Sequence, residues 1–203
     1  MLFDCFGTLF YNESGLTPFQ KLQKLLRDFK KENFLEFVER VRTRGEDLEK
    51  ALRDFLGKEG KKNLLGKALR IMRQKNERML AYPETFEVIE KLKEKGIKVG
   101  IVSNTYRESF ERVRKAYPVE KIFDAVVLSY EVKCAKPSPE IFRIGAEKLG
   151  LRPEEVLFVG DTKETDYEGA KRAGMQAVLL DREGKHEEVR ERVKNLREIL
   201  KLF

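Results

Sequence analysis

The sequence has no tryptophan, a single histidine and only two cysteines, Cys5 and Cys134. Two isolated cysteines exclude a disulfide framework and a CxxC metal site. Neither has an arginine six residues later, where Tyr11 and Glu140 stand instead, so the spacing of a cysteine phosphatase is absent as well. His186 lies in a polar stretch, where a solvated side chain is favoured over a ligand. A reduced, cytoplasmic protein is therefore expected.

Long hydrophobic runs are missing too. No stretch of 18 apolar residues occurs, so the sequence predicts no helix that crosses a membrane. The first residues carry no basic region, and Asp4 interrupts their apolar run, so we expect no secretory signal peptide.

Charge is abundant, and it is unevenly placed. Charged residues make up 38% of the chain, a composition typical of thermophilic proteins whose surfaces carry ion-pair networks. Residues 12–82 hold 18 Lys and Arg against 11 Asp and Glu, which accounts for the whole net charge of +7. This segment either steers anions toward a site or is a solvated surface. A nucleic-acid partner is not favoured, because its Phe and Leu residues are spaced as a core and not as stacking platforms.

Two hydrophobic patterns divide the chain. From about residue 17 to 80, apolar residues recur at helical spacing, which predicts about four amphipathic helices packed as a small bundle. Beyond that segment, apolar strands alternate with helices, which predicts a parallel sheet covered on both faces, and Leu2–Phe6 belongs to the same sheet. We therefore expect an α/β fold, with a Rossmann-like core (1–11 and 83–203) and an inserted all-helical domain (12–82).

Glycines mark the ends of several predicted helices in the core. Gly96, Gly150 and Gly174 each follow a helical pattern, as helix C-termini often require. The full prediction comprises strands at 98–102, 125–128, 156–159 and 177–180, and helices at 84–95, 107–116, 139–150, 166–173 and 187–201.

Polar side chains follow the predicted strands at their carboxyl ends, where ligands bind in open parallel sheets. Taken one by one they have structural interpretations: Asp4 or Ser103-Asn104 as turn residues, Lys136 as a loop lysine, Asp166 as a helix cap. Taken together they are candidates to converge on one point: Asp4, Thr8, Ser103, Asn104, Lys136, Asp161 and Asp166.

Four motifs in these positions resemble, in order, those of the haloacid dehalogenase superfamily. They are FDCFGTL, VSNT, the lysine of KPSPEIF, and GDTKETD followed by GAKRAG. The resemblance covers the whole chain, and the helical segment lies where that family carries its helical cap. It implies a hydrolase, most often a phosphatase that acts on a small phosphorylated substrate through an aspartyl-phosphate.

The resemblance also implies a magnesium site. Asp4 would be both the nucleophile and a ligand of Mg²⁺, which prefers oxygen donors. Asp161 and the backbone carbonyl of Phe6 would complete the protein ligands. Asp166 would bind the ion through water or orient the other ligands.

The remaining motif residues would handle the substrate. By resemblance, Lys136 would neutralise charge on Asp4 and on the transferring group. Ser103 and the backbone amides after Asp4 would donate hydrogen bonds to phosphoryl oxygens. Asn104 would contribute to substrate binding, and Thr8 would support the loop or donate as well.

The chain departs from the family pattern at one position. Phosphatases of this family usually carry a second aspartate two residues after the nucleophile, which protonates the leaving oxygen. Phe6 stands there, as an aromatic residue tends to in members that cleave carbon–halogen bonds. A metal-independent 2-haloacid dehalogenase is therefore the alternative, and a non-catalytic binding module the third possibility.

The fourth motif argues against the dehalogenase. Such enzymes typically have Ser-Ser-Asn where this chain has Gly160-Asp161-Thr162. Asp161 beside Asp4 would place two like charges close together, which is costly without a cation. The sequence therefore favours a magnesium-dependent phosphatase that is slow or suited to good leaving groups.

Overall fold

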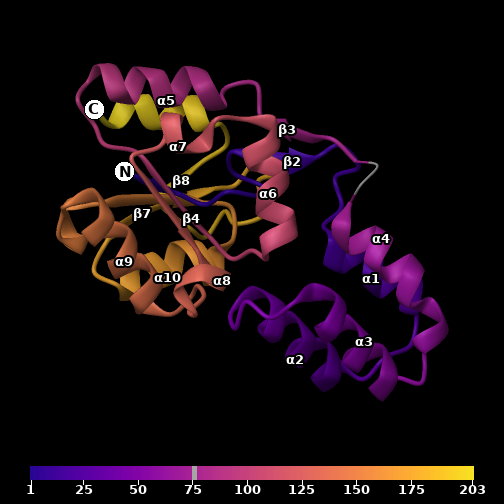
Figure 1. The fold of residues 1–203 in the computed structure, drawn as a ribbon. Helices are drawn as coiled ribbons and strands as arrows, with labels where there is room; N and C mark the ends of the chain where they lie inside the picture. Colours follow the sequence, from indigo (N-terminus) through magenta and orange to yellow (C-terminus); the bar gives the residue numbers. More distant parts are fainter. Residues whose placement is uncertain (75–76) are drawn as a thin grey trace.

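The core of the molecule is a six-stranded parallel sheet with helices on both faces (Figure 1). The computed structural model describes residues 1–74 and 77–203. The strand order is β5-β4-β1-β6-β7-β8, so β1 lies inside the sheet between β4 and β6. This confirms the predicted α/β, Rossmann-like core. The strands are β1 (Leu2–Phe3), β4 (Gly100–Ser103), β5 (Ala125–Leu128), β6 (Leu157–Gly160), β7 (Gln176–Leu180) and β8 (Arg192–Val193).

Both faces of the sheet are buried. Successive residues of a strand point to opposite faces, and accordingly Leu2 and Phe3 belong to two different hydrophobic clusters. One face is covered by α5 (Thr85–Glu94), α6 (Arg107–Ala116) and a 3-10 helix at Leu196–Leu202, the other by α9 (Pro139–Leu149) and α10 (Glu168–Arg172). Short helices α7 (Val119–Ile122) and α8 (Ser129–Val132) flank β5. None of the described helices is long and apolar enough to cross a bilayer.

The helical insert follows β1 in the chain and packs around a core of its own. Within the described range it comprises α1 (Pro18–Leu26), α2 (Lys31–Arg42), α3 (Leu48–Lys58) and α4 (Leu65–Arg73), the last preceded by a 3-10 turn at Lys62–Leu64. Thr17 closes a capping box on α1, and the Asp47 side chain caps α3. Phenylalanine side chains fill this core, where the rings of Phe37 and Phe55 stack with their centres 5.2 Å apart. About four helices were expected here, and the described part of the insert contains four.

The end of the predicted helical segment is wrong in one respect. Met79–Ala81 forms strand β3, which pairs antiparallel with β2 (Phe10–Asn12). The helical prediction for residues 17–80 also covered 75–76, which lie outside the described residues. The three residues Met-Leu-Ala are too few to distinguish a strand from the end of a helix. The strand with which they pair lies about seventy residues earlier in the chain. The division into residues 1–11, 12–82 and 83–203 stays a prediction.

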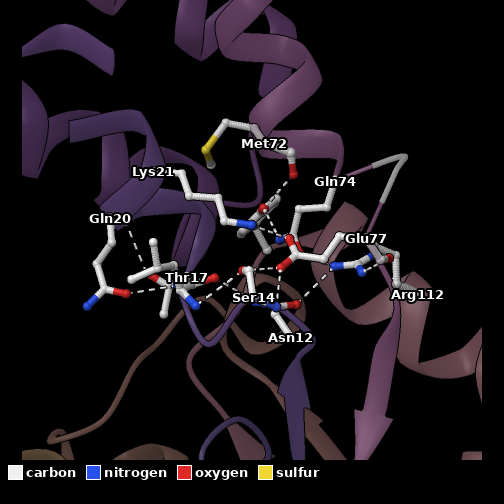
Figure 2. Close-up of polar contacts among 11 residues, drawn as sticks. Asn12, Ser14, Thr17, Gln20, Lys21, Met72, Gln74, Glu77 and Arg112 are labelled. Atoms are coloured by element: carbon white, nitrogen blue, oxygen red, sulfur yellow. Dashed lines mark hydrogen bonds and ion pairs between the residues drawn. The ribbon is translucent and has the colours of Figure 1, made fainter. Parts of the chain in front are cut away.

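Polar contacts tie the two connections between core and insert to each other (Figure 2). Glu77 accepts hydrogen bonds from Ser14, whose N–H lies 3.1 Å away, and pairs with Lys21 of α1. Arg112 of α6 donates to Asn12 Oδ1 at 3.2 Å and also contacts Gln74. The insert is therefore anchored to the core at both of its chain crossings.

The predicted helix at 187–201 is wrong. The chain instead forms β8, which extends the sheet beside β7, and then the 3-10 helix Leu196–Leu202. Asn195 explains the break, because its side chain accepts from Arg197 N–H (2.9 Å) while Glu198 accepts from the Asn195 N–H (2.9 Å). This capping arrangement starts a new helix at residue 196 and frees the preceding residues to pair with the open sheet edge.

Candidate active site

A cavity of about 360 Å³ lies between the carboxyl ends of the central strands and the helical insert. All predicted site residues except Thr8 line it. The insert contributes Thr17, Pro18, Phe19 and Arg42. A larger hollow of about 860 Å³ opens at the opposite edge, beside the amino ends of β1, β6 and β7, away from every motif residue. The smaller cavity is therefore the candidate site.

Three carboxylates and one ammonium group form the floor of this cavity. Oxygens of Asp4, Asp161 and Asp166 lie within 4.8 Å of one another. Lys136 Nζ lies 2.5 Å from Asp4 Oδ1 and 2.7 Å from Asp166 Oδ1, and all three of these side chains are almost fully buried. Three carboxyl groups thus face one ammonium group. Such an oxygen-rich, under-compensated cluster fits a hard divalent cation.

Burial and the neighbouring charges shift the pKa values of this cluster. Burial raises the pKa of Asp4 to about 6, although the neighbouring Lys136 charge opposes the shift. Burial, followed by the charges of Asp4 and Asp166, raises the pKa of Asp161 to about 8. Burial alone would lower the pKa of Lys136, but the Asp166 and Asp4 charges outweigh it and raise that pKa above its usual range. Lys136 therefore stays protonated, and a second cation would let both aspartates ionise.

Two glycines leave room for these carboxylates. Gly7 has φ +90°, and a Cβ there would lie 2.1 Å from Asp161 Oδ2. A Cβ on Gly160 would lie 2.5 Å from the Asp166 carboxylate. The glycines of the first and fourth motifs therefore let the backbone approach the acidic cluster closely.

Gly7→Ala should consequently displace Asp161. If the cluster binds Mg²⁺, as the resemblance implies, titration calorimetry should show an affinity for Mg²⁺ about 10–100-fold lower in this variant, the range seen when support for metal ligands is lost. Gly15→Ala is the matched control, because Gly15 also has positive φ (+70°) but nothing lies within 4 Å of its Cβ position. Equal affinities in the two variants would show that the close approach to Asp161 is unimportant.

Ser103 and Asn104 end β4 at the cavity. Ser103 Oγ is fully buried and, among the residues that the structure describes, has no hydrogen-bond partner. Asn104 uses both ends of its amide on the backbone of Lys136, accepting from its N–H and donating to its carbonyl, each at 2.8 Å. Ser103 is thus a free donor at the cavity, whereas Asn104 holds the Lys136 loop; substrate binding by Asn104 stays a prediction.

Asp166 does not cap a helix that starts beside it. It lies inside a π-helical turn, Lys163–Tyr167, that precedes α10, so the predicted helix start at 166 is wrong. Its Oδ2 accepts from Thr162 N–H at 3.0 Å, and its Oδ1 pairs with Lys136. Both oxygens are thus engaged by the protein, which favours an orienting role over direct binding of an ion.

Thr8 is fully buried with its Oγ1 unpartnered in the described chain, and it does not line the cavity. Arg182, from the loop after β7, donates to the Thr8 carbonyl at 3.1 Å and ion-pairs with Glu84 at 2.6 Å. Arg182 thus braces the loop within the first motif. Thr8 as a catalytic group stays a prediction.

Sequence reasoning missed Arg42 and Arg182. Arg42 is one of 18 basic residues in its segment, and Arg182 belongs to no motif. Neither position carries a local pattern that separates it from a solvated surface charge. Only the packing of the insert and of the β7 loop against the motifs reveals them.

The family model of the haloacid dehalogenase-like hydrolases matches residues 1–174. The chain belongs to this family. This confirms the family resemblance that the four motifs indicated.

Relatives within the family carry out different reactions. A glyceraldehyde 3-phosphate phosphatase of Methanopyrus kandleri is 36% identical over 112 residues, 55% of this chain and 47% of that protein. (S)-2-haloacid dehalogenase 4A of Burkholderia cepacia is 35% identical over 104 residues, 51% of this chain and 45% of that protein. The chain spans about half the length of these curated relatives. A HAD phosphatase from Thermococcus onnurineus matches in structure with a TM-score of 0.65 and 27% identity, covering 99% of this chain and 95% of that one.

Proposed function

We propose that this protein is a magnesium-dependent phosphatase that hydrolyses a small phosphorylated substrate through an aspartyl-phosphate on Asp4. The observation that carries the proposal is the cluster of three aspartates around one lysine. A metal-free dehalogenase would have to keep Asp161 beside Asp4 without a compensating cation, and burial already raises the pKa of Asp161 to about 8. A divalent ion removes this penalty.

The residues present fit such an ion. Asp4, Asp161 and the carbonyl of Phe6 would hold Mg²⁺, and Asp166 would orient its neighbours. When bound, the ion supplies positive charge to the phosphoryl oxygens. The cavity volume, about 360 Å³, suits a small substrate.

The side chains of the chain itself divide the remaining work. Asp4 presents an oxygen at the sheet edge to attack phosphorus. Lys136 touches Asp4 and adds positive charge beside the transferring group. Ser103 Oγ, otherwise unpartnered in the described residues, donates to a phosphoryl oxygen. The insert lines the side of the cavity that faces the sheet edge.

One observation favours the alternative, a 2-haloacid dehalogenase. Phe6 lines the cavity at the position where the family's phosphatases keep an acid, and a halide needs no proton to leave. The Burkholderia cepacia dehalogenase is also among the similar proteins, at 35% identity. A direct assay separates the two activities.

The assay measures phosphate release from p-nitrophenyl phosphate, with Mg²⁺ and with a chelator, and halide release from 2-chloropropionate in parallel. We expect phosphate release that requires Mg²⁺ and stops on chelation. Halide release that persists in the chelator, without phosphatase activity, would contradict the proposal and establish the dehalogenase.

A further inference from the structure

The cavity lacks an obvious donor for the leaving group. Phe6 offers no proton. Of the other groups that line the cavity in the described chain, the three aspartates belong to the proposed metal site, and Lys136 donates to two of them. Tyr106 donates its hydroxyl to Met72 O at 2.6 Å, and burial raises its pKa. The remaining hydroxyls are serines and threonines, which are very weak acids.

In-line attack decides where the leaving group lies. The attacking and leaving oxygens sit on opposite sides of phosphorus. Asp4 belongs to the sheet edge, so the leaving group points away from the sheet and toward the insert, which lines the other side of the cavity. Whatever stabilises the leaving oxygen must therefore come from α1 or α2.

Arg42, at the end of α2, is the cation on that side. Its guanidinium lies 4.4 Å from the centre of the Phe19 ring, and both residues line the cavity. Its Nε is fully buried and has no hydrogen-bond partner among residues 1–74 and 77–203. Burial lowers its pKa, although the Asp4 charge counteracts part of this effect. The residue as a whole is half-buried, so the rest of its guanidinium is not enclosed as Nε is. A positively charged donor without a partner on the wall of the cavity suits an anionic group of a bound substrate.

From these observations we propose that Arg42 pairs with a leaving group that departs as an oxyanion, so that the substrate is an acyl phosphate or a phosphoanhydride and not an alkyl phosphate. This inference rests on the proposed phosphatase activity and names its substrate class. The positive charge of Arg42 takes the place of the proton that a phosphatase acid would supply.

The two steps of the reaction balance in atoms and charge without a general acid. An Asp4 oxygen attacks phosphorus, the bond from phosphorus to the leaving oxygen breaks, and its electron pair stays on that oxygen. The product leaves as a carboxylate or phosphate anion paired with Arg42. Water then attacks the phosphorus of the aspartyl-phosphate, the bond to Asp4 breaks, and Asp4 returns as a carboxylate. Both protons of the water leave with the phosphate as H₂PO₄⁻.

The test compares two matched pairs of substrates: acetyl phosphate with ethyl phosphate, and p-nitrophenyl phosphate with phenyl phosphate. Inorganic pyrophosphate distinguishes a phosphoanhydride from an acyl phosphate. We expect kcat/KM for acetyl phosphate to exceed that for ethyl phosphate by at least about 10²-fold, the lower range of what a general acid supplies. Phe6→Asp should narrow this gap by restoring an acid.

Arg42→Gln should lower kcat/KM for acetyl phosphate by about 10²–10³-fold, as removal of one charge-stabilising donor does. The ratio of kcat/KM for p-nitrophenyl phosphate to kcat/KM for phenyl phosphate should also rise. The poorer leaving group, phenolate, develops more negative charge on its oxygen and therefore depends more on Arg42. A purely structural role of Arg42 would not change this ratio. Arg42→Lys should retain part of the activity. Arg44→Gln is the control, since Arg44 is exposed on the same insert and pairs only with Glu39 among its described neighbours.

Each outcome separates the two proposals. If wild-type protein hydrolyses ethyl and acetyl phosphate equally, or if Arg42→Gln keeps full activity with an unchanged aryl ratio, the role of Arg42 is wrong while the phosphatase stands. If no substrate releases phosphate in a manner that depends on Asp4, both proposals fail. If Arg42→Gln and Arg42→Met both lower the Tm, and neither changes the ratio of p-nitrophenyl to phenyl phosphate hydrolysis, Arg42 only packs on Phe19.

Discussion

Asp4→Asn is expected to lower kcat for phosphate release by about 10⁴–10⁶-fold, because the variant has no nucleophile for the covalent route. Asparagine keeps the size of the side chain, so the cavity should retain its shape. The measurement is single-turnover release from p-nitrophenyl phosphate with Mg²⁺. Asp28→Asn, on the exposed surface of the insert, controls for the loss of one negative charge. Activity above about 1% of wild type would exclude Asp4 as the nucleophile.

The same substitution should not destabilise the fold in the presence of a chelator. Burial raises the pKa of Asp4 to about 6, above its ordinary value of 3.8, so the folded state disfavours the ionised form. The stability that protonated Asp4 contributes is complete below pH 4 and is lost as the pH rises through 6. Neutral asparagine avoids this loss. We therefore expect the variant to have an equal or higher Tm at pH 8, and a lower Tm there would contradict the origin of the pKa shift.

Lys136→Met should damage both activity and stability. The Lys136 side chain is 2% exposed and compensates Asp4 and Asp166 together. Removing one partner of a buried ion pair leaves uncompensated charge, which typically costs about 3–5 kcal/mol. We expect the free energy of unfolding, from urea titration in a chelator at pH 8, to fall by this amount, and phosphate release to be lost.

Two comparisons give this prediction its control. Lys115→Met, on the exposed face of α6, should change the free energy of unfolding by less than about 0.5 kcal/mol. Mg²⁺ should restore part of the stability of Lys136→Met, because it supplies positive charge to the same carboxylates. A variant as stable as wild type in the chelator would show that Lys136 is not needed to balance the acidic cluster.

Much of the core and of the motif site followed from the sequence. Apolar strands that end in Asp4, Ser103 and Asp161 could be recognised locally, because a parallel sheet buries both faces and brings its carboxyl ends to one edge. Lys136 and Asp166 were candidates for the same edge, and the order of the motifs supplied their expected roles. The structure places all five side chains around one cavity.

The tertiary structure alone decided what depends on distant partners. Met79–Ala81 became a strand because Phe10–Asn12 pairs with it, and Arg192–Val193 became a strand because the edge of β7 was open. Each of these segments is only two or three residues long, and its partner strand is distant in the chain. The local sequence pattern therefore could not distinguish a strand from a helix.

The insert shows the same division most clearly. Its four helices follow from hydrophobic spacing, and its excess of positive charge follows from composition. Which of the 18 basic residues faces the site does not, because a helical pattern sets the buried stripe of each helix but not how the bundle docks on the sheet. That docking places Arg42 in the cavity beside Asp4 and leaves Arg44 in solvent.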